Sequence, residues 1–271
     1  MRRGGARPTH DQTGAWGRRP QRVQGGALAF LLLLLLTATP ATAQVVSLNL
    51  CTDQYLLALA PARATAVSFL ARDPTLSVMT EAAAQVPVVR ADAEAVLALR
   101  PTLVLAGPWG ARATLAALER RGIAVVRIDP PADFASIRAT TRRLGALLGA
   151  PDRAEALLAE MAAELDRPKA SGRAIALEPR GLTAGPGSLR DAVLRAAGLL
   201  NAADGRAMSL EALARAPSVL LVVAPPPPTP SRATAFLAHP ALARHPRREV
   251  PAALTVCGGP WTARAVALLA P

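Results

Sequence analysis

The pattern of hydrophobic and polar positions repeats itself once along this chain. Residues 93–107 and 209–224 each read as a short helical segment carrying a glutamate, then a proline, then a continuous apolar run. The proline ends the helix because it lacks an N–H group and clashes with the preceding turn. An unbroken run of Val and Leu is typical of a strand buried on both faces of a parallel sheet. The repeat therefore predicts two similar α/β lobes.

The first half of the chain alternates between the two kinds of pattern. Apolar runs predict strands at 45–49, near Ala66, at 86–89, at 103–107 and at 123–129. Helices are expected at 53–60 and at 112–121, the second closed by Gly122. Strands that alternate with helices indicate a parallel sheet covered on both faces. Residues 44–131 are therefore predicted to form an N-terminal α/β lobe.

A long helix is expected next, after Pro130 and Pro131, with Asp133 as its candidate N-cap. Its apolar side chains at helical spacing are Phe134, Ile137, Leu144 and Leu148. We expect residues 132–150 to form one connecting helix, a stiff spacer between the lobes. A second helix at 152–165 then opens the C-terminal α/β lobe, residues 151–271. The predicted fold is thus two Rossmann-like lobes with parallel sheets, joined by one long rigid helix.

The second lobe is expected to repeat the organisation of the first. A strand at 173–178 leads into a segment rich in turn residues, 179–187. Ser188, with Asp191 three residues later, resembles a capping box for a helix that ends at Gly198. The Pro225–Pro228 run after the next strand is interpreted as an extended loop, because four prolines cannot supply a sheet ladder. A binding role for this run is the alternative.

The chain opens with the features of a secretory signal peptide. Arginines precede ten apolar residues, 27–36, and Ala41-Thr42-Ala43 matches a cleavage site of small residues. A spanning helix needs roughly 20 apolar residues, so residues 1–43 are predicted to be a cleavable signal peptide, with a membrane anchor as the alternative. Its removal takes away six arginines and one aspartate, which lowers the net charge from +12 to +7. No basic run is interleaved with aromatic residues, and nucleic-acid binding is not expected.

Candidate site residues follow from where ligands bind in open α/β sheets, beyond the carboxyl ends of the strands. The loops expected there carry polar and aromatic side chains suited to a large ligand, with ordinary loop roles as the alternative: Asn49, Trp109, Arg180, Thr183 and Trp261. Glu94 and Glu211 occupy equivalent places in the repeat. They are expected to contact a partner that spans both lobes, or else to be solvated charges in helix first turns.

Two cysteines follow the predicted leader, Cys51 and Cys257. In an exported protein an even number permits one disulfide, and two buried thiols are the alternative.

Motifs of enzymes and of metal sites are missing from the sequence. There is no phosphate-binding loop, no nucleophile elbow and no dinucleotide fingerprint. His239 and His245 each precede a proline in an expected turn, and a zinc site would need three or four ligands. We therefore predict no enzyme, no metal site and no cofactor. The alternatives are an exported α/β enzyme that uses Asp53, Glu178 or Cys257, and a protein that binds a bare metal ion through the two histidines.

Taken together, these features resemble the periplasmic binding proteins of ABC importers for vitamin B12, ferric siderophores and haem. The resemblance extends from residues 45–49 through the two repeats to the segments GLTAGPGSL at Gly181, LAHPAL at Leu237 and CGGP at Cys257. It implies a monomer in the periplasm with a shallow cleft between two lobes. It also implies one acidic residue on each lobe that pairs with arginines of the membrane permease, and Glu94 and Glu211 match these positions.

The expected ligand also follows from the resemblance. Relatives for cobalamin and haem usually line the cleft with several aromatic residues, whereas Leu182 and Gly107 stand here where one is expected. Leu182 is included among the candidate ligand contacts. Arg180 would suit an anionic ferric siderophore through charge-assisted hydrogen bonds. A ferric siderophore or a cobalamin-like chelate is therefore expected.

Overall fold

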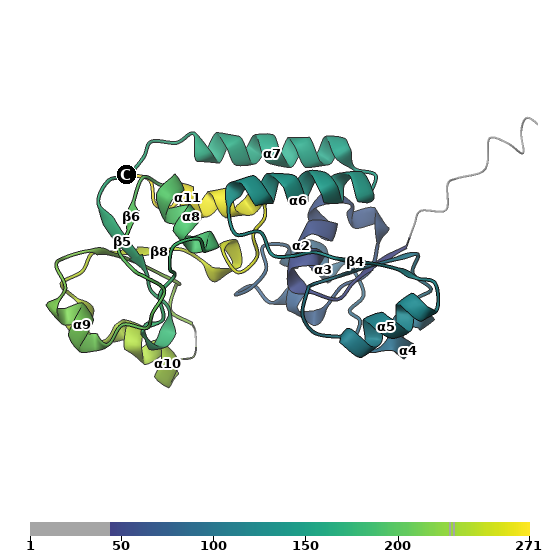
Figure 1. The fold of residues 1–271 in the computed structure, drawn as a ribbon, viewed down its shortest axis with the longest axis horizontal. Coiled ribbons are helices and arrows are strands. Elements are labelled where there is room, and N and C mark those ends of the chain that lie inside the picture. Colours follow the sequence, from purple (N-terminus) through teal and green to yellow (C-terminus); the bar gives the residue numbers. More distant parts are fainter. Residues whose placement is uncertain (1–43, 228, 230) are drawn as a thin grey trace, which may run out of the picture. The chain divides into compact units, whose positions relative to one another are not determined.

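The computed structural model describes residues 44–227, 229 and 231–271, so the predicted signal peptide lies outside the described residues. Two separate four-stranded sheets form the framework (Figure 1). The first has the order β2-β1-β3-β4 and the second β6-β5-β7-β8, and every strand pair is parallel. We call each sheet with its covering helices a lobe. The prediction of two α/β lobes with parallel sheets is confirmed.

The bounds of the elements are as follows. The strands are β1 (Val45–Ser47), β2 (Ala64–Ala66), β3 (Leu103–Ala106), β4 (Ala124–Arg127), β5 (Arg173–Ala176), β6 (Leu200–Asn201), β7 (Leu220–Val223) and β8 (Arg247–Glu249). The α-helices are α2 (Leu50–Leu59), α3 (Thr80–Ala84), α4 (Ala93–Ala98), α5 (Arg112–Arg120), α6 (Phe134–Leu147), α7 (Pro151–Leu165), α8 (Leu189–Ala196), α9 (Leu210–Arg215), α10 (Arg232–Ala235) and α11 (Ala263–Ala267). Among the described residues, none of these helices has the length and apolar character to cross a membrane.

The short 3-10 helices complete the chain: η1 (Pro61–Arg63), η2 (Phe69–Arg72), η3 (Pro179–Gly181), η4 (Phe236–Ala238), η5 (Pro240–Leu242), η6 (Ala252–Leu254) and η7 (Pro260–Thr262).

Two differences between the predicted and the observed elements have a clear physical reason. The helix expected at 53–60 begins at Leu50, because Asn49 acts as its N-cap and accepts a hydrogen bond from the N–H group of Cys51. The strand expected at 86–89 is wrong, since this segment forms only an isolated bridge between Val67 and Val88. Pro87 lies within that segment and has no N–H group to donate to a ladder.

The repeated segments fold alike. Helices α4 and α9 begin at the N-caps Asp92 and Ser209, whose side chains accept hydrogen bonds from the third helical N–H group. Glu94 and Glu211 both occupy the second helical position and are exposed. The residue two positions later, Val96 in α4 and its counterpart in α9, is fully buried. Each helix is followed by a proline and then by a buried strand, as the repeat predicts.

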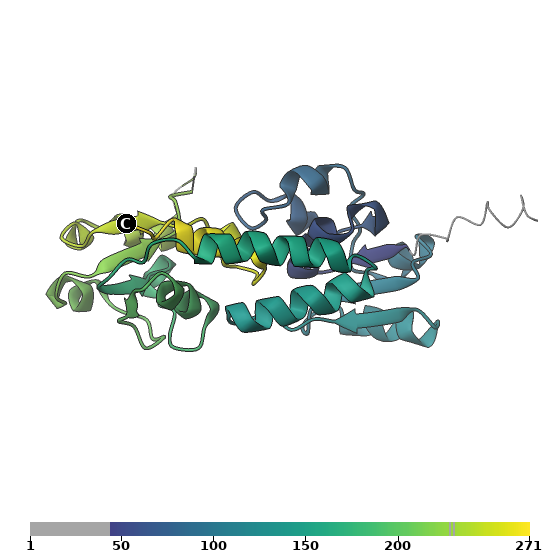
Figure 2. The same cartoon turned by 90° about the horizontal axis from the view of Figure 1, so that it is seen from above.

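The connection between the sheets contains two helices, α6 and α7, which lie side by side in both views (Figures 1 and 2). Asp133 and Ser136 cap α6 reciprocally. Each helix contributes to both cores. In α6, Leu144 packs in the core of the first lobe and Phe134 against that of the second. In α7, Leu157 packs in the core of the first lobe and Leu165 against that of the second. The helix pair therefore ties the two cores together along its length.

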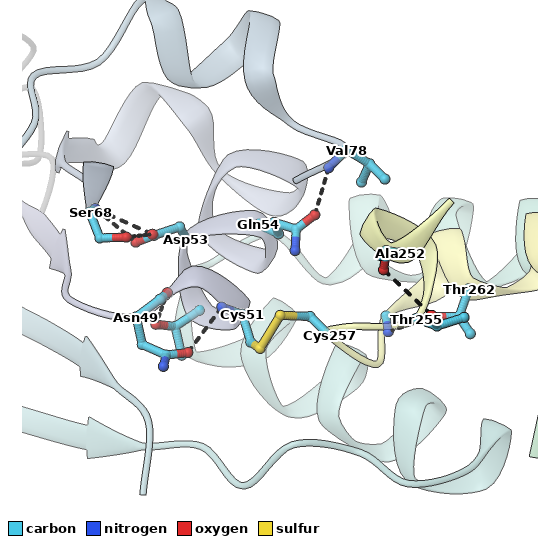
Figure 3. Close-up of a disulfide and its surroundings, with 12 residues drawn as sticks. Asn49, Cys51, Asp53, Gln54, Ser68, Val78, Ala252, Thr255, Cys257 and Thr262 are labelled. Atoms are coloured by element: carbon cyan, nitrogen blue, oxygen red, sulfur yellow. Dashed lines mark hydrogen bonds between the residues drawn. A yellow bond between two sulfur atoms is a disulfide. The ribbon is translucent and has the colours of Figure 1, made fainter. Parts of the chain in front are cut away.

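The C-terminal segment also belongs to both lobes. Val266 and Leu269 pack in the core of the second lobe, whereas Cys257 and Trp261 pack in the core of the first. A disulfide joins Cys257 to Cys51 on α2, with a Cα–Cα distance of 5.2 Å and a sequence separation of 206 (Figure 3). This bridge and the helix pair are thus two independent connections between the lobes.

Candidate ligand-binding site

In the first lobe, the predicted ligand residues lie at the carboxyl ends of two neighbouring strands. Asn49 follows β1, and Trp109 follows β3, which pairs with β1. The Asn49 side chain is fixed by its capping bond to the N–H group of Cys51, 2.9 Å from Oδ1. A Cβ atom at Gly107 would lie 2.8 Å from Asn49 Nδ2, so a side chain there would displace the amide. Trp109 is 77% exposed and free to contact a ligand.

An exposed aromatic residue that the sequence analysis did not assign to the site lies on the same edge. Phe69 follows β2 and is 70% exposed. In the strand order β2-β1-β3, Phe69, Asn49 and Trp109 follow the carboxyl ends of three successive strands. The signal in the sequence was an aromatic residue three positions after Ala66, beyond the end of the short strand.

In the second lobe, the predicted residues lie on the loop after β5. Arg180 is exposed and has a left-handed backbone with φ of 63°. Leu182 is 50% exposed. The Thr183 hydroxyl donates a hydrogen bond of 2.7 Å to the carbonyl oxygen of Arg206. This bond stabilises the loop and uses the donor of the hydroxyl. Among the residues predicted to bind ligand, Arg180 and Leu182 thus have exposed side chains, whereas the Thr183 hydroxyl is engaged within the loop.

The structure corrects the expectation for Trp261. Its side chain is only 4% exposed and packs in the core of the first lobe. Its ring lies 5.3 Å from that of Tyr55, and its indole N–H group donates to the carbonyl oxygen of Cys257 at 3.2 Å. Both the apolar surface and the polar group of Trp261 are therefore used within the fold. Its placement depends on a contact with α2 that is remote in sequence.

A pocket of about 630 Å³ lies against the second lobe and also receives residues of the first. Its lining is mostly apolar and comes from the loop after β7, from α10 and η4, from β8 and the residues that follow it, and from a turn of the first lobe: Pro74, Thr75, Leu76, Pro179, Val223, Ala224, Pro225, Pro226, Pro227, Thr234, Ala235, Leu237, Ala238, Arg247, Glu249, Pro251 and Ala252. A mainly apolar wall with a few polar groups is typical of sites for organic ligands.

The first lobe's contribution to the pocket is held in place by hydrogen bonds. The Asp73 carboxylate accepts from the N–H group of Thr75 at 2.8 Å and from its hydroxyl at 2.7 Å, which closes the turn. The N–H group of Val78 donates to Gln54 Oε1 on α2 at 2.9 Å (Figure 3). The turn at Pro74–Leu76 is therefore closed by its own hydrogen bonds and held to α2 through Val78.

No pattern in the sequence predicts this pocket. The Pro225–Pro227 run is a loop, as expected, but it forms one wall of the pocket. Pro228, the last residue of the predicted run, lies outside the described residues. Pro179, next to Arg180, lines the pocket, whereas the predicted ligand residues themselves do not. The available signal was the position of the prolines directly after the carboxyl end of a buried strand.

The three residues considered for catalysis each have a structural partner. Cys257 is in the disulfide. Glu178 forms an ion pair of 2.5 Å with Arg190. The Asp53 carboxylate is fully buried and accepts hydrogen bonds from the Ser68 N–H group and hydroxyl (Figure 3). Burial raises the pKa of Asp53 to about 7, although hydrogen bonds from Ser47 and Ser68 act in the opposite direction.

The two histidines considered as metal ligands also have structural roles. His245 is buried, and its Nδ1 accepts a hydrogen bond of 3.3 Å from the N–H group of Val219. The ring proton is therefore on Nε2, which donates to the carbonyl oxygen of Leu213 at 3.0 Å. His239 caps η5 through Nδ1. Across the described part of the chain, no group of three or more His, Cys, Asp or Glu residues is placed to hold a metal ion.

Comparison with known proteins identifies the family. The model of the periplasmic binding protein family matches residues 45–246, and the chain belongs to this family. The resemblance inferred from the sequence is confirmed at that level. A comparison with curated protein sequences gives no match to this chain.

Three solved structures illustrate the likeness. A periplasmic haem-binding protein from Pseudomonas aeruginosa is 26% identical, with 84% of this chain and 91% of that chain covered and a TM-score of 0.60. The periplasmic haem-binding protein BhuT, solved with two haems, is also 26% identical, with coverages of 83% and 96% and a TM-score of 0.62. RhuT from Roseiflexus sp. RS-1, at 22% identity, coverages of 83% and 95% and a TM-score of 0.61, shows the shared fold.

Proposed function

We propose that this protein is the periplasmic solute-binding component of an ABC importer, and that it captures a ferric siderophore or a cobalamin-like metal chelate between its lobes. The observation that carries the proposal is the pocket of about 630 Å³ to which both lobes contribute. Its volume and its apolar wall suit the organic framework of a chelate. Membership of the periplasmic binding protein family and the haem-binding relatives support the same function.

The lobes are held in a way that suits capture without a large closing motion. The α6–α7 pair packs into both cores, and the Cys51–Cys257 bridge adds a second connection. A ligand would then meet a site that is largely formed before binding, which lowers the entropic cost of association. Residues 1–43 would direct export to the periplasm and be removed from the mature protein.

Delivery to the inner-membrane permease would use Glu94 on α4 and Glu211 on α9. Both side chains are exposed, and both lie in the first turn of a helix, where a negative charge is favoured. A hydrogen bond from the Ser209 side chain lowers the pKa of Glu211, which keeps its carboxylate ionised. One carboxylate on each lobe would pair with basic residues of the permease and set the docking orientation.

The double substitution Glu94→Ala and Glu211→Ala tests this function. We expect the Kd for the chelate to change by less than about twofold, and association with the reconstituted permease to weaken by about tenfold or more, with reduced salt dependence. Both quantities are measured on the mature protein. Glu81→Ala, an exposed glutamate in the first turn of α3, is the matched control and should alter neither.

Each other outcome contradicts a defined part of the proposal. An equal loss of chelate affinity would place the glutamates in the ligand site. Unchanged association would remove their docking role. A wild-type protein that binds no metal chelate would contradict the function itself.

A further inference from the structure

Two opposite charges face the pocket from one strand. Arg247 and Glu249 of β8 line the pocket, whereas Arg248 between them does not. Side chains alternate between the two faces of a strand, and β8 pairs with β7 in a regular parallel register from Leu221↔Arg247 to Val223↔Glu249. Positions two apart on a strand are separated by roughly 7 Å. The pocket therefore offers a cation and an anion at a fixed spacing.

Neither charge is neutralised by another described residue. The ion pairs of the described chain join other residues, such as Arg190 with Glu178 and Arg195 with Asp191, and neither Arg247 nor Glu249 takes part in one. Their side chains also form no hydrogen bond within this part of the chain. Both groups are exposed and can be solvated by water.

A ligand that covers Arg247 and Glu249 must displace the water that solvates these two charges. The rest of the lining is dominated by proline, alanine, valine and leucine, which offer no polar partners to the two charges. A charge that loses its hydration without gaining a partner is strongly unfavourable. The ligand must therefore present an acceptor to Arg247 and a donor to Glu249.

Different metal chelates meet this requirement differently. An amide group offers both a carbonyl oxygen for Arg247 and an N–H group for Glu249. A ligand whose polar groups are carboxylates satisfies Arg247 but places negative charge beside Glu249. Such repulsion against one class of ligand is a common source of specificity.

We propose that Glu249 is a specificity-determining residue that selects amide-bearing chelates without net negative charge over carboxylate-bearing chelates such as haem. Arg247 binds an acceptor of the same ligand. The pocket wall formed by Pro225–Pro227 packs on the apolar framework of the ligand. This inference rests on the proposed function and narrows the ligand class. It also alters the ligand expected from Arg180, because Arg180 does not line the pocket and Glu249 does.

The test measures Kd values of the mature protein for cyanocobalamin, for ferrichrome, a neutral hydroxamate chelate, and for hemin, a dicarboxylate. Glu249→Gln keeps the size of the side chain and removes its charge. We expect it to tighten hemin binding by about tenfold or more relative to binding of the neutral chelates, because the repulsion is lost. Arg247→Gln should weaken the binding of hemin, because it removes the cation that pairs with a carboxylate. Arg248→Gln, on the same strand but absent from the pocket lining, is the matched control and should leave the ratio of Kd values unchanged.

The outcomes separate the inference from the function on which it rests. A wild-type protein that prefers hemin to both neutral chelates overturns the inference and the proposed ligand class, and leaves the role of a solute-binding protein for metal chelates intact. A Glu249→Gln variant with an unchanged Kd ratio also overturns the inference, when its thermal melt shows that it is folded. Failure of the wild-type protein to bind all three chelates contradicts the proposed function, and the inference falls with it.

Discussion

Replacement of both Cys51 and Cys257 by alanine is expected to lower the free energy of unfolding by about 5 kcal/mol. The bridge closes a loop across a sequence separation of 206, and a cross-link of that length removes a large conformational entropy from the unfolded chain. The loss of the Cys257 sulfur atom from the core of the first lobe adds a smaller packing loss, which reduction of the bridge does not cause. Reduction of the wild-type protein should produce most of this loss, because it opens the same cross-link.

Thermal and denaturant unfolding of the oxidised protein, the reduced protein and the double variant measure this effect. For a mature chain of this size, about 5 kcal/mol corresponds to a decrease in Tm of roughly 10–20 °C. The single variant Cys51→Ala should match the double variant, and reductant should affect neither. A decrease of less than about 2 kcal/mol, or two labelled thiols per unfolded chain without reductant, would show that the bridge is not the connection described.

Substitution Asp53→Asn is expected to remove a pH-dependent destabilisation of about 4 kcal/mol. Burial raises the pKa of Asp53 from 3.8 to about 7 in the folded protein. Well below pH 3.8 both the folded and the unfolded states hold the proton, and the group contributes no penalty. Between pH 4 and pH 7 the unfolded state ionises while the folded state stays protonated, so stability falls as pH rises. Above pH 7 the penalty is complete, at about 1.4 kcal/mol for each pKa unit.

Urea unfolding of the wild-type protein and of Asp53→Asn at intervals from pH 4 to pH 8 tests this expectation. The asparagine variant should gain stability relative to the wild type as pH rises, because its carbonyl oxygen still accepts from Ser68 and carries no charge to desolvate. Asp73→Asn is the control. Hydrogen bonds from Thr75 lower the pKa of this exposed aspartate, so its contribution is lost as pH falls, the opposite sign. A difference between wild type and Asp53→Asn that is flat across this range would contradict the burial of an ionisable carboxyl.

Local signals in the sequence were enough to predict most of the fold. The N-caps Asp133 and Ser188 and the stop at Gly122 act within one turn of the helices that they bound, and the buried strands are continuous apolar runs. The strand expected at 86–89 does not form. The prediction gave more weight to the apolar residues of this segment than to the missing N–H group of Pro87. Asn49 was assigned to a ligand loop, and its capping role was not anticipated.

The site depends on contacts that are remote in sequence, and these could be predicted only in part. Trp109 and Leu182 are exposed at the carboxyl ends of strands, where the topology places ligand contacts. Trp261 was misplaced because its burial against Tyr55 follows from the return of the C-terminal segment to the first lobe. The pocket combines the turn at 74–76 with segments 223–227 and 234–252, which no local pattern relates. The pairing of the two cysteines was left open for the same reason.

Capture of a metal chelate is tested most directly by equilibrium titration of the mature protein, residues 44–271, with cyanocobalamin, a ferric hydroxamate siderophore and hemin. We predict that at least one of them binds saturably to a single site, with a Kd of about 1 µM or below. Absence of saturable binding of all three at tens of micromolar, in a protein shown to be folded, would contradict the proposed function.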